Sequence, residues 1–215
     1  MAGLFLTFEG PEGAGKTTQI SLLEKVLRQA GYGVTRTREP GGDLVGERVR
    51  DVVLNAPAGS VTAEAELFLM AAARAQNVQA VVRPALERGD IVLCDRFTDS
   101  TLAYQGYGRG LPQEALAPVN RLATGGLVPD RTFLLDLPPA LGLSRQNAEK
   151  QDRLDKEGLT FHERVRNGFL AVAANEPDRF VVIDATRPVG EIAATLHDAV
   201  WSLLSSLPTP VPEIP

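Results

Sequence analysis

The chain has 215 residues, of which 44% are hydrophobic and 23% charged, and its net charge is −5. This length and apolar content are enough for one compact domain with a substantial core, and they exclude disorder for most of the chain. The acidic balance argues against general electrostatic binding to nucleic acid, so an anionic ligand must be held by locally placed groups.

Two features of the sequence indicate the compartment. No run of about 18 uncharged apolar residues occurs, so we expect no membrane span, and Met1–Phe5 contains no basic residue of a signal peptide. The single cysteine, Cys94, cannot form an internal disulfide, which fits a reducing environment. We therefore expect a soluble cytoplasmic protein that binds neither membranes nor nucleic acid.

Five short apolar runs predict strands. They are Leu4–Phe8, Val34–Thr37, Ile91–Cys94, Thr132–Leu137 and Phe180–Ile183. Four of them are almost continuously hydrophobic, as expected for strands buried on both faces of a parallel sheet. The second is more polar and is expected at a sheet edge or beside an active site.

Helical patterns alternate with these runs. The expected helices are Thr17–Ala30, a long helix from Thr62 to Gly89 that is kinked or restarted at Pro84, and then Gln113–Thr124, Pro139–Asn147, Thr160–Ala174 and Val189–Ser205. Thr62 is expected to cap the long helix. Strands that alternate with helices predict an α/β fold, a parallel sheet with helices on both faces.

A phosphate-binding loop follows the first expected strand and opens the first expected helix. The segment Gly10-Pro11-Glu12-Gly13-Ala14-Gly15-Lys16-Thr17 matches the pattern G-x-x-x-x-G-K-[ST]. A glycine-rich turn before a helix is the alternative, but the strand–loop–helix context favours a nucleoside triphosphate site. We expect Lys16 to face solvent and reach β- and γ-phosphate oxygens, and the Thr17 hydroxyl to ligate Mg²⁺. With Thr18, these residues form the predicted ATP site.

Asp95 ends the third expected strand, where a Mg²⁺-orienting carboxylate of a second nucleotide motif usually lies. The alternative is a carboxylate that caps the following helix. Cys94, beside it, is most simply a small buried hydrophobic residue.

Three arginines, Arg38, Arg74 and Arg96, distinguish a kinase from a simple nucleotide switch. Phosphoryl transfer between two anions needs several fixed cations, and guanidinium groups suit bidentate phosphate binding. Each alone is more often a surface charge or an ion-pair partner. Together, near strand ends beside the loop, they indicate a phosphate-acceptor site, and no guanine-reading N-K-x-D pattern occurs.

Several motifs resemble bacterial thymidylate kinases. The segment Asp95–Gly106 resembles their D-R-[FY]-x-x-S-x-x-A-Y-Q-G block, and Thr37–Gly42 is similar to their T-R-E-P-G-G turn. Their acceptor-site helix is similar to the segment from Glu66 to Arg74-Ala75-Gln76, which is followed by Arg83–Leu86. Their fourth-strand segment is similar to Leu135-Asp136 with Gly142–Arg145. The resemblance runs from Leu4 to about Asp184.

The resemblance implies transfer of the γ-phosphoryl group of ATP to dTMP, which yields dTDP and ADP for the synthesis of dTTP. It also implies a three-layer P-loop nucleotide-kinase fold with a parallel five-stranded sheet and a short lid, and a homodimer. Carried over by position, Arg38 and Arg96 bind the acceptor phosphate, and Glu12 lies near the acceptor sugar. Arg74 faces the thymine O4, and the remaining pocket residues are Ser100, Tyr104 and Gln105. No general base is needed, because the acceptor is an ionised phosphate oxygen.

The charge-rich segment Glu149–Glu157 is either a solvated loop or, by resemblance, the lid over ATP. Arg153 is the best match for a lid arginine that neutralises transition-state charge, with Arg145 and Lys150 as reserves. The expected domain covers residues 1–207, with the lid at about 145–158, and we expect a flexible Pro-rich tail at 208–215.

One position departs from the family. Thymidylate kinases usually place a phenylalanine that stacks on thymine four residues before the acceptor-helix arginine, and here that position is Met70. Phe68 lies about 200° around the helix from it and cannot substitute for it from the same face. Met70 either fills a core gap or covers the base through a sulfur–aromatic contact.

Two other functions remain open from the sequence. A related nucleotide kinase shares the fold and the loop. A P-loop NTPase that acts as a regulated binding module would form ADP without dTMP, whereas a kinase would require the acceptor.

Overall fold

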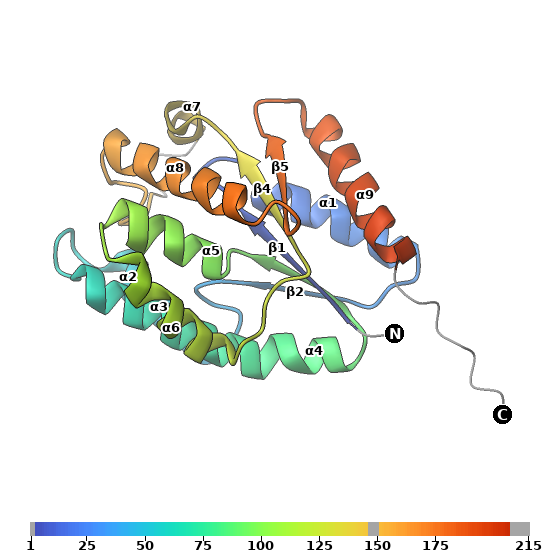
Figure 1. Ribbon diagram of the computed structural model, residues 1–215, viewed down its shortest axis with the longest axis horizontal. Helices are drawn as coiled ribbons and strands as arrows, with labels where there is room; N and C mark the ends of the chain where they lie inside the picture. The colour runs from blue at the N-terminus through green and yellow to red at the C-terminus, as the bar shows by residue number, and fades with distance from the viewer. Residues whose placement is uncertain (1–2, 146–150, 207–215) are drawn as a thin grey trace.

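The computed structural model of the protein describes residues 3–145 and 151–206 (Figure 1). Its centre is a five-stranded sheet in the order β2-β3-β1-β4-β5, and each paired neighbour is parallel. The strands are β1 (Leu4–Glu9), β2 (Val34–Arg38), β3 (Ile91–Asp95), β4 (Arg131–Asp136) and β5 (Phe180–Asp184). The expected α/β fold with a parallel five-stranded sheet is confirmed.

Helices cover both faces of this sheet (Figure 1). The α-helices are α1 (Lys16–Gln29), α2 (Leu44–Asn55), α3 (Ala63–Asn77), α4 (Arg83–Glu87), α5 (Thr98–Thr101), α6 (Gln113–Thr124), α7 (Pro139–Ser144), α8 (Leu159–Asn175) and α9 (Val189–Ser206). Two π-helical segments, η1 (Val78–Val82) and η2 (Leu102–Gly108), follow α3 and α5. No helix in the described ranges is long and apolar enough to cross a membrane.

The expected long helix forms as the continuous run α3–η1–α4. The Thr62 hydroxyl caps it by accepting a hydrogen bond from the Ala65 N–H at 3.2 Å. Pro84 lies in the first turn of α4, directly after the π-helical segment, so the chain restarts its α-helix there as predicted. The final residues of the expected helix Pro139–Asn147, and the tail at 208–215, lie outside the described residues.

Helix α2 was not expected from the sequence. Its N-cap is Asp43, whose carboxylate accepts a hydrogen bond from the Gly46 N–H at 2.7 Å. Two of its residues are buried, Gly46 and Val53, while Leu44 is 74% exposed. Val45, Val49, Val52 and Val53 recur at helical spacing, so the periodicity of this helix was present in the sequence but was not used. The segment α5–η2 was likewise missed as a helix.

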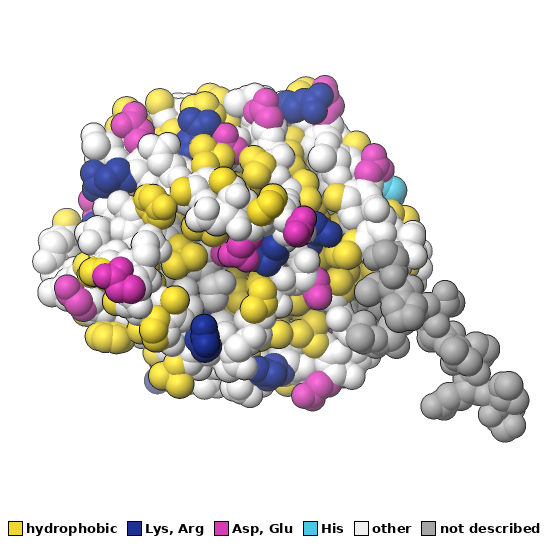
Figure 2. Space-filling model, in the orientation of Figure 1, with side chains coloured by type: hydrophobic (Ala, Val, Ile, Leu, Met, Phe, Trp, Pro, Cys, Tyr) yellow, Lys and Arg dark blue, Asp and Glu magenta, His cyan; other side chains and the backbone are white. Residues whose placement is uncertain are grey.

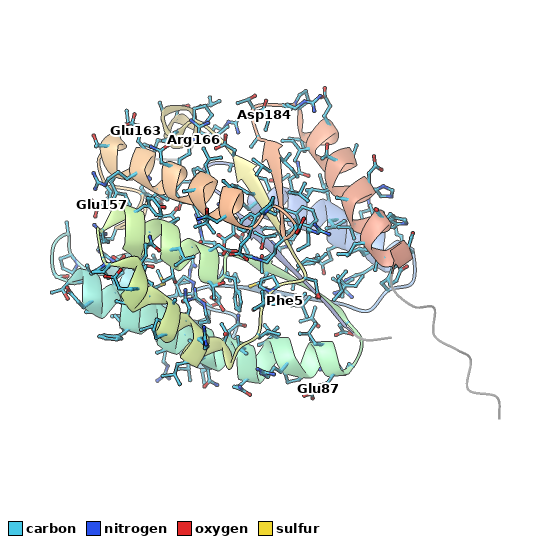
Figure 3. All side chains as sticks on the ribbon, viewed as in Figure 1. Phe5, Glu87, Glu157, Glu163, Arg166 and Asp184 are labelled. Carbon is cyan, nitrogen blue, oxygen red and sulfur yellow. The ribbon has the colours of Figure 1, made fainter. Side chains whose placement is uncertain are left out.

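Alternate residues of β1 face two different cores. Leu4, Leu6 and Phe8 pack with α1 and α9 on one face. Phe5 (labelled in Figure 3) packs on the other face with η1 and α4, and its ring meets that of Phe97 edge to face at a centroid distance of 4.9 Å. Cys94 is buried in this second cluster, as expected. A third cluster joins α8 to η2 on the same face.

One of the two edge strands of the sheet was expected from the sequence and the other was not. The polar strand β2 is an edge, as the sequence indicated. The prediction that Phe180–Ile183 is buried on both faces is wrong, because β5 is the other edge and Val182 is 52% exposed.

Because the strands are parallel, their carboxyl ends all lie at the same end of the sheet. There β1 continues into α1 on one face, while β3 continues into α5 on the other, so a crevice opens between their ends. The loops after β1, β2 and β3 all meet at this crevice.

Candidate nucleotide-binding site

The phosphate loop spans the turn between β1 and α1 and packs tightly on its neighbours. Gly10 and Gly13 have positive φ angles of 139° and 70°. A Cβ atom at Gly10 would lie 2.3 Å from the Leu135 carbonyl oxygen, and one at Gly13 would lie 2.2 Å from that of Gly142. Glycine is therefore required at both positions by conformation and by space.

Lys16 is folded into the loop that it follows. Its ammonium group donates hydrogen bonds to the carbonyl oxygens of Gly10 and Pro11, each at 3.0 Å, and the residue is 7% exposed. The expectation that this side chain faces solvent is wrong, because the loop carbonyls hold it inside. Burial lowers the pKa of Lys16, and the nearby Arg96 lowers it further.

Thr17 and Asp95 form the arrangement expected for a metal. The Thr17 hydroxyl donates to Asp95 Oδ2 at 3.0 Å, and both residues line the same cleft. Within the described residues there is no group of three His, Cys, Asp or Glu side chains that could hold a metal ion. Mg²⁺ in nucleotide sites takes few protein oxygens beside phosphate and water, so the pair fits Mg²⁺ held jointly with a phosphate ligand.

The cleft beside the loop has a volume of about 600 Å³. It is lined by Glu12, Gly13, Ala14, Gly15, Lys16, Thr17, Thr18, Arg36, Thr37, Arg38, Glu39, Gly42, Glu47, Arg50, Asp95 and Arg96. All predicted ATP-site residues except Gly10 and Pro11 line it, and those two instead supply the carbonyls that bind Lys16.

A second cavity of about 100 Å³ lies between α3, η2 and the segment before α8. Its lining includes six of the residues assigned to an acceptor by resemblance, namely Met70, Arg74, Arg96, Ser100, Tyr104 and Gln105. Asp152 and Leu154, from the charge-rich segment, also line it.

Four charged residues line both cavities: Glu12, Glu39, Arg50 and Arg96. The two cavities therefore meet at two carboxylates and two guanidinium groups. This junction is where a group bound in one cavity would face a group bound in the other.

Glu12 and Arg96 form the centre of the junction. Arg96 Nη2 donates to Glu12 Oε1 at 2.6 Å, and the Tyr104 hydroxyl donates to the same oxygen at 2.6 Å. Burial by itself raises the pKa of Glu12, but Arg96 and Lys16 outweigh it and lower the pKa to about 2. Glu12 is therefore ionised at neutral pH. Burial by itself lowers the pKa of Arg96, whereas the nearby Glu12 raises it. The net effect is a raised pKa.

A strained turn carries Arg96. It has a φ of 70° and is the one non-glycine residue with positive φ in residues 3–145 and 151–206. Glu9, fully buried at the end of β1, holds this turn: its carboxylate accepts from the N–H of Phe97 at 2.8 Å, and from the N–H and hydroxyl of Ser100 at 3.2 and 2.6 Å. Sequence reasoning missed Glu9, although an acidic residue ending an apolar strand was a usable signal.

Burial raises the pKa of Glu9 to about 7, and the nearby Asp99 adds to the rise, against smaller effects of Arg96 and the Ser100 and Phe97 hydrogen bonds. Asp99 is itself paired with Arg179 at 2.7 Å. Buried polar groups thus run from the junction towards the C-terminal end of α8.

Arg74 is almost fully buried and fixed on several sides. Its Nε donates to Glu39 at 2.7 Å, Nη1 to Thr101 and Asn120 at 2.9 and 2.7 Å, and Nη2 to the Phe97 carbonyl at 2.9 Å. Glu39, from the turn after β2, was not singled out from the sequence. Its role depends on a partner 35 residues away.

Arg50 belongs to the junction, whereas Arg38 lines the loop-side cleft and not the second cavity. Arg38 is half exposed and pairs with Glu47 at 2.8 Å, while Arg50 Nη1 donates to the Pro40 carbonyl at 3.1 Å. Sequence reasoning missed Arg50 because it lies on the unexpected helix α2. An arginine seven residues after Asp43, the N-cap, was the available signal.

The charge-rich segment does not bring Arg153 to the phosphate loop. Arg153 Nη2 donates to Glu66 at 2.6 Å and Nε to the Val53 carbonyl at 2.8 Å, and it lines neither cavity. Arg145 Nη1 lies 3.3 Å from the Gly13 carbonyl of the loop. Lys150, the other reserve, lies outside the described residues.

Met70 lines the second cavity, whereas Phe68 is 62% exposed. The register deduced from the spacing to Arg74 therefore agrees with the structure. Met70 also packs on the α8–η2 core cluster, so it contacts both the cavity and the core.

Comparisons with known proteins give one consistent family. The model of the thymidylate kinase family matches residues 8–196. The thymidylate kinase of Deinococcus radiodurans is 58% identical over 199 residues, which cover 92% of this chain and 96% of the relative. That of Desulfovibrio desulfuricans is 50% identical over 209 residues, covering 94% and 96%. A crystal structure of thymidylate kinase from Ehrlichia chaffeensis superposes with a TM-score of 0.76 at 33% identity, over 93% of this chain and 99% of that chain.

Proposed function

We infer that this chain, which belongs to the thymidylate kinase family, is an enzyme that transfers the γ-phosphoryl group of ATP to dTMP and forms dTDP and ADP. The observation that carries the inference is the junction at which the loop-side cleft and the second cavity share Glu12, Glu39, Arg50 and Arg96. A donor and an acceptor bound on its two sides would face each other across two arginines.

The donor side is supported by the loop-side cleft. The backbone N–H groups of the loop and the N-terminus of α1 favour a polyphosphate. Lys16 already lies among the loop carbonyls, and its ammonium group can exchange them for β- and γ-phosphate oxygens. Mg²⁺ held by Thr17, with Asp95 beside it, would neutralise charge on the same oxygens.

The acceptor side is supported by the second cavity. Arg96, Arg38 and Arg50 surround the position of an acceptor phosphate, and Arg74 with Gln105 closes the end that a base would occupy. The cavity of about 100 Å³ is smaller than a nucleotide, so its side chains must move apart on binding. Asp152 and Leu154 of the lid segment line it and belong to the parts that move.

Catalysis then needs positioning and charge neutralisation and no general base. The attacking group is a phosphate oxygen that is already ionised, so no proton has to be removed. Arg96, oriented by Glu12 and by the turn that Glu9 holds, keeps this oxygen in line with the transferred phosphorus. The lid supplies a further cation: Arg153 acts on the transferred group once it leaves Glu66, and Arg145 is the alternative from beside the loop.

We also propose a cytoplasmic homodimer. Phe68 on α3, Val52 on α2 and Leu122 on α6 are 62%, 52% and 86% exposed, and a second copy of the chain would bury such apolar side chains at an interface. On the face in Figure 2, hydrophobic side chains lie among charged residues of both signs. Light scattering after gel filtration tests the dimer, and a monomeric mass at micromolar concentration would contradict it.

The activity is tested by coupling ADP release to NADH oxidation in the presence of each nucleoside monophosphate. We expect ADP to form only when an acceptor is present and fastest with dTMP. Preference for another monophosphate would indicate a related nucleotide kinase, and ADP formed at the same rate without acceptor would indicate an NTPase.

A further inference from the structure

Glu66, on α3, is fully buried and lines neither cavity, yet three side chains donate hydrogen bonds to it. Gln105 Nε2 lies at 2.7 Å, Arg153 Nη2 at 2.6 Å and Arg109 Nη2 at 3.1 Å. Burial by itself raises the pKa of Glu66, but the bonds from Gln105, Arg153 and Arg109 outweigh burial and hold it below the usual value. At neutral pH both Glu66 oxygens are therefore acceptors and neither can donate.

Ionised Glu66 dictates which way the Gln105 amide faces. An amide has one oxygen that accepts and one NH₂ group that donates, and a carboxylate can bind the NH₂ group alone. Nε2 therefore faces Glu66, and Oε1 forms the other branch of the amide. Among the described residues Oε1 has no hydrogen-bond donor, and Gln105 lines the second cavity.

Arg74, which lines the same cavity, provides a donor. Its described hydrogen bonds to Glu39, Thr101, Asn120 and the Phe97 carbonyl use four of its five N–H groups. One Nη2 N–H remains. The cavity lining thus offers one fixed donor and, through Gln105, one acceptor.

We propose that Glu66 is a positioning residue for base selection, which fixes the Gln105 amide so that its oxygen accepts the N3–H of thymine. The proposal rests on the proposed function, because it takes dTMP as the acceptor. Thymine offers O4 to the Arg74 N–H and N3–H to the Gln105 oxygen. Cytosine has an amino group and an unprotonated N3 at these positions. The Arg74 donor would then face another donor, and the Gln105 oxygen would face another acceptor.

The conservative variant Glu66→Gln tests this role. A glutamine at position 66 can either donate or accept, so the Gln105 amide is free to turn. We expect the KM for dTMP to rise about tenfold, and the ratio of kcat/KM for dTMP to that for dCMP to fall about tenfold, as when a buried polar partner is lost. The KM for ATP should stay within about twofold of wild type, because Glu66 does not line the ATP cleft.

A reciprocal exchange separates orientation from simple stability. Gln105→Glu alone sets a second carboxylate against Glu66 and should weaken dTMP binding. In the double variant Glu66→Gln with Gln105→Glu, the new amide donates to the new carboxylate, whose other oxygen still accepts from N3–H. We expect the double variant to recover a dTMP KM within about threefold of wild type.

Arg109→Gln is the matched control, because it removes another donor to Glu66 and leaves the Gln105 bond intact. It should leave the dTMP-to-dCMP ratio unchanged. The proposal is overturned if Glu66→Gln keeps the wild-type ratio, or if Arg109→Gln changes the ratio as much. If Glu66→Gln alone does not fold, Gln105→Glu and the double variant decide: no recovery of the dTMP KM overturns the proposal. ADP release by the wild type without dTMP would instead overturn the proposed function.

Discussion

Arg96 and Glu12 hold each other at the junction of the two cavities, with Arg96 Nη2 2.6 Å from Glu12 Oε1. The phosphate loop therefore orients, through its own carboxylate, the arginine assigned to the acceptor. The pair thus joins the loop-side cleft to the second cavity.

The first prediction is that Arg96→Lys removes activity although it keeps the charge. A lysine cannot bind Glu12, the Gly10 carbonyl and Ser100 together as the guanidinium group does. We expect kcat/KM for dTMP to fall by about 100-fold or more and the Kd for ATP to change by less than about threefold. Steady-state kinetics and calorimetry measure these. Arg88→Lys, at an exposed site before β3, is the control and should have no effect.

The second prediction concerns pH and stability. The pKa of Glu9 is about 7 in the fold and 4.5 as its ordinary value. Between pH 4.5 and 7 the folded state keeps a proton that the unfolded state has lost, so the free energy of unfolding falls as pH rises through this window. The effect is on the order of 3 kcal/mol for a shift of this size. Urea unfolding of wild type and Glu9→Gln between pH 4.5 and 8 measures it.

In that comparison, the free energy of unfolding of Glu9→Gln should fall less steeply with pH than that of wild type, whatever the absolute stability of the variant. An equal slope in both proteins would show that Glu9 does not titrate in this range. Glu12 acts in the opposite direction: its pKa of about 2 adds stability above pH 4.5 that is lost as pH falls from 4.5 towards 2. The two carboxylates, three residues apart, thus titrate in separate windows.

The third prediction is that Lys16→Ala abolishes dTDP formation while the protein stays folded. The lysine contributes two hydrogen bonds to loop carbonyls, but its charge is needed chiefly by the phosphates. Circular dichroism melting should show a modest change, and the coupled assay no activity. Lys25→Ala, on the exposed side of the same helix, should retain full activity. Near-normal turnover of Lys16→Ala would remove Lys16 from the mechanism.

The fourth prediction tests the lid. Arg153→Ala should lower kcat by about 10³-fold and change the dTMP KM much less, because a lid arginine acts on charge that develops in the transition state. Lys156→Ala, an exposed cation of the same segment, is the control. If Arg145→Ala or Lys150→Ala has the larger effect, the lid role belongs to that residue. If none of the three matters, the segment is a solvated loop.

The fifth prediction concerns the base. Met70→Ala should raise the dTMP KM about two- to tenfold, since sulfur–aromatic contacts contribute about 0.3–1.5 kcal/mol, and should leave the ATP KM unchanged. Met70→Phe should keep activity, with dTMP affinity equal or better. A dTMP KM that does not respond to Met70→Ala would show that Met70 serves the core cluster alone.

The sequence by itself determined what depends on neighbours along the chain. The loop Gly10–Thr17, the cap at Thr62, the restart at Pro84 and the five strands follow from local spacing and apolar periodicity. The side on which Met70 and Phe68 lie followed from the turn angle of a helix alone.

The tertiary structure decided what depends on partners far apart in the chain. Glu9 holds a turn about 90 residues away because β1 lies beside β3 in the sheet, and Glu66 on α3 meets Arg153 across 87 residues. Arg50 was missed because helix α2, which carries it, was not predicted, and because its place beside the second cavity depends on the tertiary structure. Lys16 is buried because loop carbonyls, which no sequence pattern reports, compete with solvent for its ammonium group.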